Sequence, residues 1–231
     1  MMLTADITVS ERLRAFSMFA ALDSRRLDEL SKLVVCKHYG KGESIISSGD
    51  ESDGMYLLLR GRVKIALTSL NAKELALEYV EAPASFGEMG FAGGSSRAAD
   101  VYALTDVEVA SLPPSQMSAA LEIYPGLAMV LLTNLSRTTH VLLRRLEDIA
   151  FNDAGHRVMR VVLNVATVSY EARGIPLIEG LTHYEIATLA GTSRETASRV
   201  ISRLGRDGVL RTKGRKIIVD ILKLEDLLRV S

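Results

Sequence analysis

Residues 181–210 constrain this chain more than any other stretch, because they read as two short helices joined by a tight turn. Thr182 is placed to cap a first helix whose apolar face carries Ile186 and Leu189. Gly191 then ends that helix, as glycine often does just beyond a last helical turn. The spacing predicts a helix-turn-helix.

The second helix of this pair is amphipathic and begins at Thr192 or Ser193. Its buried stripe is expected to be Ala197, Val200, Ile201 and Leu204. Arg194, Glu195 and Arg199 fall on the other side, near the N-terminal end. A helix that enters the major groove needs this arrangement, because long donors and acceptors face the bases while apolar residues hold the inner side. The alternative is a charged face that contacts only solvent.

Basic residues continue beyond this helix. Between residues 192 and 216 there are eight Arg or Lys against two acids, which favours a polyanionic partner over a solvated face. The segment RTKGRKIIVDI predicts two short strands around a turn, a wing whose Lys213 and Arg215 reach phosphates. We therefore expect double-stranded DNA as a partner.

Composition fits a globular protein of one large or two medium domains, with 231 residues, 48% of them hydrophobic. The formal net charge is zero, but its distribution is uneven. Residues 1–130 hold 12 basic and 17 acidic side chains, whereas residues 181–231 hold 10 and 6. An acidic front half joined to a basic tail fits a sensor linked to a DNA reader.

The chain shows no apolar N-terminal leader and no apolar run long enough to span a membrane, so we expect a cytoplasmic protein without a membrane partner. Cys36 is the only cysteine, which excludes an internal disulfide and a cysteine-ligated iron–sulfur cluster. We interpret Cys36 as a small buried apolar residue. The four histidines show no metal-ligand spacing, so no metal site is expected.

Residues 37–111 contain short β-like runs separated by turns with glycine. The runs are 45–46, 55–59, 63–67, 75–80, 101–104 and 107–112. This regular spacing predicts a small antiparallel barrel or roll. A helix is expected before it, with Asp23 as its N-cap and Leu27, Leu30 and Leu33 turned inward. The fold class is therefore α+β.

A long helix is predicted over residues 127–150. Apolar or small residues recur along it at alternating spacings of three and four: Leu132, Leu135, Thr139, Leu142, Leu146 and Ile149. This is the seam of a coiled coil, which favours a homodimer; the alternative is packing within its own domain. A further helix, capped by Asn152 or Asp153, a linker at 171–176 and a short terminal helix at 224–230 complete the pattern. The expected domains are 1–125, 126–150 and 151–231.

Four segments carry a resemblance to a known family. They are GDESDGMYLLLRGRVKI (49–65), FGEMGF followed by SSRAA (86–99), FNDAGHRV (151–158) and TSRETASR (192–199). In their order and spacing the chain, from about residue 19 to 221, resembles the cyclic AMP receptor / fumarate-nitrate regulator (Crp/Fnr) family of bacterial transcription factors. The resemblance implies a homodimer with a β-roll sensor, a long dimerisation helix and a winged helix-turn-helix. It also implies RNA polymerase as a partner and allosteric control by a small-molecule effector.

The loop at 87–97 is similar to the phosphate-binding cassette of that family. Gly87 and Gly90 allow close backbone approach to an anion, Arg97 offers a bidentate guanidinium, and Glu88 can accept a hydrogen bond from a ribose hydroxyl. The predicted ligand contacts are Gly87, Glu88, Met89, Arg97, Ala98, Thr138, Thr139 and Leu142. The alternative is that Glu88 and Arg97 merely pair with each other.

Two departures from the nucleotide-binding pattern bear on the ligand. Ala98 stands where nucleotide binders of the family usually place serine or threonine. Leu142 and Leu143 stand where the cyclic AMP receptor reads adenine with a threonine and a serine. Cyclic AMP is therefore disfavoured, but a cyclic nucleotide remains the favoured effector, with cyclic GMP and cyclic di-GMP as candidates. A haem-sensing, redox-sensing or constitutive regulator remains the alternative.

The second helix of the pair matches the R-E-x-x-x-R segment with which the family reads a TGTGA-type half-site. The resemblance gives base reading to Arg194, Glu195 and Arg199, and phosphate contacts to Thr182, His183, Ser193 and Thr196. An inverted repeat of such half-sites is the predicted target. A third hypothesis is an enzyme that acts on cyclic nucleotides, but no nucleophile–base pair or paired carboxylates support it, so we expect no catalytic activity.

Overall fold

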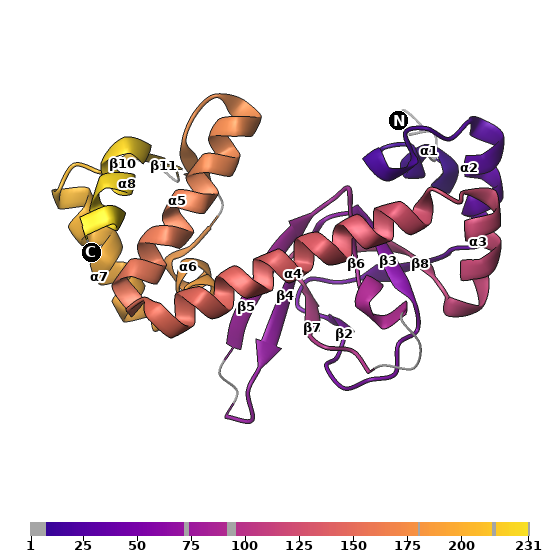
Figure 1. Cartoon of the computed structure of the whole chain (residues 1–231), viewed down its shortest axis with the longest axis horizontal. Helices are drawn as coiled ribbons and strands as arrows, with labels where there is room; N and C mark the ends of the chain where they lie inside the picture. The colour runs from indigo at the N-terminus through magenta and orange to yellow at the C-terminus, as the bar shows by residue number, and fades with distance from the viewer. Residues whose placement is uncertain (1–7, 72–73, 92–95, 180, 214–215, 231) are drawn as a thin grey trace, which may run out of the picture. The chain divides into compact units, whose positions relative to one another are not determined.

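The computed structural model describes residues 8–71, 74–91, 96–179, 181–213 and 216–230 (Figure 1). Internal contacts divide the chain into two compact units. The first holds the chain up to Leu67 together with Glu78–Val141; the second holds Thr68–Leu77 together with the chain from Leu142 onward. The division falls within one hairpin and within one long helix, so both of these elements contribute residues to each unit.

Two antiparallel four-stranded sheets form the centre of the first unit. One sheet has the order β1-β8-β3-β6 and the other the order β2-β7-β4-β5. The strands are β1 (Val35–Tyr39), β2 (Ser44–Ile46), β3 (Met55–Arg60), β4 (Arg62–Thr68), β5 (Glu74–Glu81), β6 (Ala84–Phe86), β7 (Asp100–Ala103) and β8 (Val107–Leu112). The antiparallel roll expected from the sequence is confirmed.

Side chains of β3 alternate between two hydrophobic clusters, because successive residues of a strand point to opposite faces. Tyr56 and Leu58 belong to a cluster to which both sheets contribute. Met55 and Leu57 belong to a second cluster, on the face covered by helices. In the first cluster the ring of Phe86 stacks on that of Tyr56, with centroids 5.3 Å apart. One strand thus anchors both halves of the core.

Each strand-like run of the sequence coincides with a strand, except that Leu104 falls one residue beyond β7, and two strands go beyond the prediction. β1 begins at Val35, two residues before the expected start of the β region. β6 (Ala84–Phe86) was not expected at all. It follows directly on Pro83 and reads Ala-Ser-Phe, without the β-branched residues that mark the equally short β2.

Helices cover the second cluster of the first unit. They are α1 (Val9–Leu13), η1 (Ser17–Phe19), α2 (Ser24–Ser31), η3 (Pro114–Gln116) and α3 (Met117–Ile123), while η2 (Glu88–Phe91) lies in the loop after β6. Asp23 caps α2 as expected and accepts a hydrogen bond from the Arg26 backbone N–H at 2.9 Å. Leu27 and Leu30 are buried and Leu33 is half-buried.

The long helix is α4 (Leu127–Phe151), one residue longer than the sequence predicts. Large apolar side chains along it remain exposed by half or more: Met129, Leu132, Leu143, Leu146, Ile149 and Phe151. Within the expected seam, Leu135 and Leu142 are half-buried. Such a stripe is typical of a helix that pairs with a second copy, so dimerisation stays a prediction.

The second unit contains the predicted helix pair. Its elements are α5 (Ala154–Arg173), β9 (Leu177–Glu179), α6 (His183–Leu189), α7 (Arg194–Arg206), β10 (Leu210–Lys213), β11 (Lys216–Val219) and α8 (Ile221–Val230). The three strands pair antiparallel in the order β10-β11-β9. The four helices of this unit share a core, in which five side chains are essentially inaccessible: Val158, Ile186, Ala197, Leu204 and Leu224.

Sequence expectations for this unit hold, with one choice between two caps decided and two changes. Asp153, not Asn152, caps α5, and its Oδ1 accepts a hydrogen bond from the His156 N–H at 2.8 Å. The linker expected at 171–176 is shorter than predicted because α5 continues to Arg173, and β9 lies between it and the helix pair and pairs with β11. The terminal helix also begins three residues earlier than expected, at Ile221.

Cys36 corrects another expectation. The sequence reading makes it a buried apolar residue, but its side chain is exposed. β1 is an edge strand, so Cys36 has a paired neighbour on one side only, Ala110 of β8. Partial burial, and then the nearby charge of Glu108, raise the pKa of this thiol above its usual value, against the opposing effect of Arg12.

Among the described residues no single helix is long and apolar enough to cross a membrane. One pair, Pro114–Ile123 with Leu127–Phe151, meets the length and composition requirement only when its two helices are taken together, and these are bent by 120°.

Candidate functional site

The start of α7 is shaped by a turn that only a few residues can make. Gly191 has a φ of +58°, a left-handed conformation that favours glycine. Ser193 then caps the helix, and its Oγ accepts a hydrogen bond from the Thr196 N–H at 3.2 Å. Ala197, Ile201 and Leu204 are buried along the inner face of α7. These contacts fix which side of the helix faces outward.

Arg194, Glu195 and Arg199 are all exposed on α7. Within the described part of the chain, no hydrogen bond or ion pair joins the Arg199 guanidinium to another residue. The pKa of the Glu195 carboxyl lies below its usual value, through hydrogen bonds from its own backbone N–H and from Ser193, and through the charge of Arg194. At neutral pH this surface therefore presents two cations and one anion to solvent.

The four predicted phosphate-contacting residues lie around the starts of α6 and α7. Thr182 and Glu185 form a capping box: the Thr182 N–H donates to the Glu185 carboxylate at 2.6 Å, and the Glu185 N–H donates to Thr182 Oγ1 at 3.2 Å. His183 Nδ1 and Ser198 Oγ are hydrogen-bonded at 3.0 Å, which links the two helices. Ser193 Oγ also donates to Thr196 Oγ1 at 3.2 Å.

The wing hairpin pairs β10 with β11, and Lys213 lies opposite Lys216 in the register. Arg215 and the side chain of Lys213 lie outside the described residues. Lys216 Nζ forms an ion pair with a Glu179 oxygen of β9 at 3.1 Å. The two paired strands expected from RTKGRK are thus present, and β9 pairs with the second of them, β11.

Arg97, the predicted phosphate ligand, is turned into the roll, and only 4% of its side chain is exposed. Its Nη2 donates to Asp53 Oδ1 at 2.5 Å and to the Gly54 carbonyl at 2.7 Å, and its Nη1 donates to the Gly87 carbonyl at 2.9 Å. The guanidinium also lies over the Tyr56 ring, 5.6 Å from its centroid. Its carboxylate partner is therefore Asp53, not Glu88 as in the alternative interpretation.

Asp53 is the centre of this network. Its Oδ2 accepts hydrogen bonds from the Tyr56 hydroxyl at 2.5 Å and from Lys37 Nζ at 3.3 Å. Burial raises the pKa of the Asp53 carboxyl, but hydrogen bonds from Tyr56, Arg97 and Lys37 outweigh it and hold that pKa below its usual value. Burial, and then the Asp53 carboxylate, raise the pKa of the Tyr56 phenol. At neutral pH the Asp53 carboxyl is therefore ionised, and the Tyr56 phenol keeps its proton.

Gly87 has a close-approach requirement of its own. Its φ is +79°, and a Cβ there would lie 3.0 Å from Arg97 Nη1. Because glycine has no Cβ, the backbone at residue 87 can come close enough for its carbonyl to accept the hydrogen bond from Arg97 Nη1.

Two of the remaining predicted ligand residues are in contact with each other. Glu88 and Thr138 come together, with Thr138 Oγ1 donating to Glu88 Oε1 at 3.5 Å. The Thr139 hydroxyl instead donates to the Leu135 carbonyl of its own helix at 2.9 Å. Met89 and Ala98 are exposed, and Leu142 is half-buried on α4.

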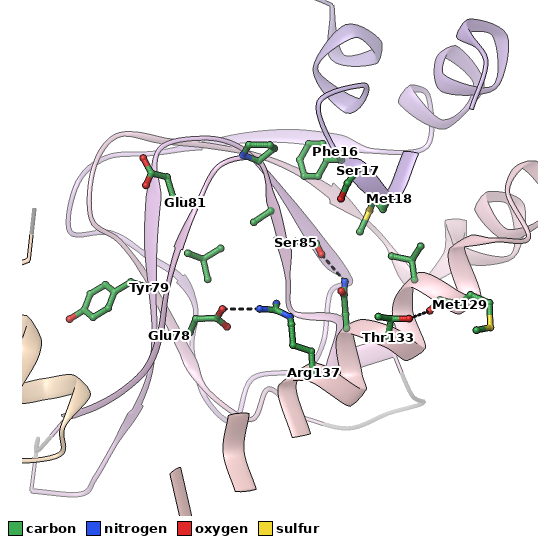
Figure 2. Close-up of a pocket in the computed structure, with 15 residues that line it drawn as sticks. Phe16, Ser17, Met18, Glu78, Tyr79, Glu81, Ser85, Met129, Thr133 and Arg137 are labelled. Carbon is green, nitrogen blue, oxygen red and sulfur yellow. Dashed lines mark hydrogen bonds and ion pairs between the residues drawn. The ribbon is translucent and has the colours of Figure 1, made fainter. Parts of the chain in front are cut away.

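A cavity of about 580 Å³ opens elsewhere in the first unit, between β5, β6 and α4 (Figure 2). On one side Arg137 Nη1 forms an ion pair with Glu78 Oε1 at 3.2 Å, and Asn134 Nδ2 donates to Ser85 Oγ at 3.2 Å. Phe16 forms part of its apolar lining. Its volume suits a small molecule, yet none of the eight predicted ligand residues is among those that line it.

Two family models match the chain. The cyclic nucleotide-binding domain matches residues 36–124, and the Crp-like helix-turn-helix domain matches residues 156–230. The cyclic AMP receptor protein of Thermus thermophilus is 29% identical over 194 residues, which cover 84% of this chain and 88% of that protein. This chain belongs to the Crp/Fnr family.

Solved structures agree with the Crp/Fnr fold. A CooA mutant from Carboxydothermus hydrogenoformans aligns with a TM-score of 0.77 and 21% identity, covering 97% of each chain. The c-di-GMP responsive global regulator CLP of Xanthomonas campestris aligns with a TM-score of 0.72 and 22% identity, covering 85% of this chain and 99% of that one. At these identities the likeness shows the fold.

Membership of the Crp/Fnr family makes the chain a transcription regulator with a cyclic nucleotide-binding domain and a DNA-binding helix-turn-helix. Asp53 is the site residue that sequence reasoning missed. Its signal was present, because it lies inside the GDESDG segment that carried part of the resemblance. The ion pair joins residues 44 positions apart, so no local periodicity could reveal it.

Proposed function

We propose that this Crp/Fnr regulator is a homodimer that reads an inverted repeat of TGTGA-like half-sites, under the control of a small effector at its roll. The observation that carries the proposal is the outward trio of Arg194, Glu195 and Arg199 at the start of α7, opposite the buried stripe of that helix. Arginine is suited to guanine, and glutamate to the amino group of cytosine. We assign the functional domains as 1–125, 126–150 and 151–231.

Dimerisation through α4 is supported by its exposed apolar side chains, among them Leu146 and Ile149. Sedimentation at micromolar concentration tests it. We expect a dimer for the native chain and a monomer for Leu146→Glu, because a charge in the seam would lose its solvation. Glu147→Gln, the adjacent exposed position, serves as the control and should remain dimeric. A monomeric native chain would contradict the proposal.

For the effector we propose a cyclic nucleotide at the loop that begins with Gly87, with Glu88 and Thr138 beside it. Relatives point to different nucleotides: one is named a cyclic AMP receptor protein and another a c-di-GMP responsive regulator. Ala98 and Leu142 disfavour cyclic AMP here, so cyclic GMP and cyclic di-GMP rank ahead of it.

A second candidate is the same DNA-binding regulator without a nucleotide ligand, either constitutive or sensing haem or redox state. One observation favours it: Arg97 already donates three hydrogen bonds within the chain, to Asp53 and to the carbonyls of Gly54 and Gly87. A phosphate would have to share or displace these partners.

Selection of bound sites from random DNA, with and without each nucleotide, tests target and control together. We expect an inverted repeat with TGTGA-like arms whose enrichment rises with one nucleotide. Isothermal titration with cyclic AMP, cyclic GMP and cyclic di-GMP identifies the ligand, and silence from all three would favour the second candidate. A Soret band in the purified protein would single out haem.

We also propose that the regulator works in the cytoplasm, where it contacts RNA polymerase and double-stranded DNA, and that it has no enzymatic activity of its own. Co-purification with polymerase on operator DNA tests the first point. Incubation with cyclic nucleotides tests the second, since hydrolysis would contradict it.

A further inference from the structure

The last carbonyl groups of α6 are bonded by two arginines. Carbonyls at the end of a helix lack partners within the helix and must find them elsewhere. Arg145 Nη1 donates to the Leu189 carbonyl. Arg157 Nε donates to the Ala190 carbonyl at 2.8 Å, and its Nη2 donates to the Gly191 carbonyl at 3.2 Å. Three consecutive carbonyls at the turn of the helix-turn-helix are thus held by guanidinium groups.

Both arginines also bond to other parts of the second unit. Arg145 lies on α4, and its Nη2 donates to the Leu77 carbonyl at 3.3 Å. Arg157 lies in α5, and its Nη1 donates to the carbonyl of Asn152, the residue that follows α4, at 2.8 Å. The C-terminal part of α4 is therefore bonded directly, through Arg145, to the turn that precedes α7.

The region where α4 and α5 meet the end of α6 is closely packed. A cavity of only about 10 Å³ lies between Arg145, Arg157, Ile149, Leu189 and Leu75, hardly room for one water molecule. A Cβ on Gly191 would meet the Leu75 side chain at 3.1 Å. A guanidinium presents its donors in a rigid plane, so it fixes the direction of the groups that it joins, which the single ammonium of lysine does not.

We propose that Arg145 is a positioning residue that fixes the orientation of the α6–α7 pair on α4. The inference rests on the proposed function, because in a dimer paired through α4 this orientation sets the distance between the two copies of α7. Arg145 would thereby determine the spacing of half-sites that the dimer accepts, while the bases within each half-site are read by other residues.

Arg144 provides a matched control. It is the adjacent residue on α4 and is exposed, and within the described ranges no hydrogen bond or ion pair joins it to another residue. Arg144→Lys makes the same chemical change as Arg145→Lys without touching α6. Both variants keep the charge of α4, so a difference between them reports on the hydrogen bonds of the guanidinium.

The first experiment measures Kd for the selected operator and for versions whose spacer is one base pair longer or shorter. Losing hydrogen bonds from a charged donor shifts an equilibrium by about tenfold. We expect Arg145→Lys to reduce the native preference for one spacer by about this factor, with base preference within each half-site retained. Arg144→Lys should behave like the native chain. An unchanged spacer preference in Arg145→Lys would overturn the proposal.

The second experiment needs no DNA. Spin labels at Glu147→Cys on α4 and Arg206→Cys on α7, both exposed positions, are placed in a full chain carrying Cys36→Ser and diluted with unlabelled chain. Pulsed EPR should give one narrow distance within a chain, broadened by Arg145→Lys but not by Arg144→Lys. Equally narrow distributions would overturn the inference. A broadened distribution from a protein that binds no DNA would refute the proposed function and leave the positioning role standing.

Discussion

Arg97 lies in the β-roll with 4% of its side chain exposed, whereas Arg194 and Arg199 on α7 are open to solvent. Sequence motifs single out all three as groups that bind an anion or a base. Arg97 donates three hydrogen bonds, to one carboxylate and two carbonyls of its own domain. Arg199 has no hydrogen-bond or ion-pair partner within the described chain. The comparison teaches that one kind of side chain serves structure at one site and is available for recognition at the other.

The sharpest way to break this comparison is to remove the buried guanidinium. Arg97→Met leaves the Gly54 and Gly87 carbonyls without their donor and half-exposed Asp53 without its closest partner, and we expect the free energy of unfolding to fall by about 3 kcal/mol. Urea denaturation measures it. Arg60→Met, at an exposed arginine that ends β3, is the control and should change stability little. Equal effects from the two variants would show that Arg97 has no structural role.

Removal of an exposed guanidinium should instead weaken DNA binding and leave the stability of the fold nearly unchanged. Arg194→Ala or Arg199→Ala should leave the melting temperature nearly unchanged and weaken binding to the selected operator by about 1–3 kcal/mol, with one base position relaxed. Fluorescence anisotropy on operator variants measures this. Arg206→Ala, at the far end of α7, should leave base preference unchanged. If neither reading-helix variant altered affinity or base preference, the assignment of base reading to α7 would be wrong.

The pH dependence of stability tests the structural role of the Arg97–Asp53 pair further, because the Asp53 carboxyl can be titrated. The folded protein holds the pKa of this carboxyl below its unfolded value, so its contribution to stability is present above the unfolded pKa and is lost as pH falls through the folded pKa. Because its side chain is 50% exposed, we expect Asp53→Asn to cost about 1–2 kcal/mol at pH 7, less than a fully buried pair would.

The difference between native and Asp53→Asn stability should narrow below about pH 4, where the free carboxyl titrates. Asp50→Asn, which removes an exposed carboxylate nearby, is the control and should change stability at pH 7 less than Asp53→Asn does. A difference that stayed constant from pH 7 to pH 3 would mean that the charge of Asp53 does not stabilise the roll.

The smallest effect concerns the cap from which the exposed arginines project. Ser193→Ala removes the acceptor for the Thr196 N–H and should lower the free energy of unfolding by about 1 kcal/mol. Thermal melting measures it, with the exposed mid-helix substitution Ser202→Ala as the control. Operator affinity should fall with Ser193→Ala if the first turn of α7 must be ordered to read bases, and an unchanged affinity would argue against that need.

Local signals predicted most of the fold. Caps at Asp23, Thr182 and Ser193 lie where the sequence places them, because an N-cap is a contact over three residues. The six β-like runs and the long helix were visible through their periodicity. β6 and β9 were not, since each is a strand only by virtue of its partner, whereas the equally short β2 carries two adjacent β-branched residues, Ile45 and Ile46.

The candidate sites divide in the same way. The outward face of α7 follows from helical periodicity, so its exposed residues could be named in advance. The bonding of Arg97 to Asp53, and of Arg145 to Leu189, joins residues 44 positions apart in each case and depends on tertiary packing. The exposure of Cys36 was also beyond local reasoning, because it depends on β1 being an edge strand.

The pairing of β9 with β11 has a mechanical consequence for the reader. Chain segments on both sides of the helix pair are stitched into one small sheet, and Ile178 lies opposite Ile217 in its register. The helix pair is thus an insertion between strands β9 and β10, and the pairing of β9 with β11 holds the two ends of this insertion close together. A push on either flanking segment should therefore carry helices and hairpin along as a single block.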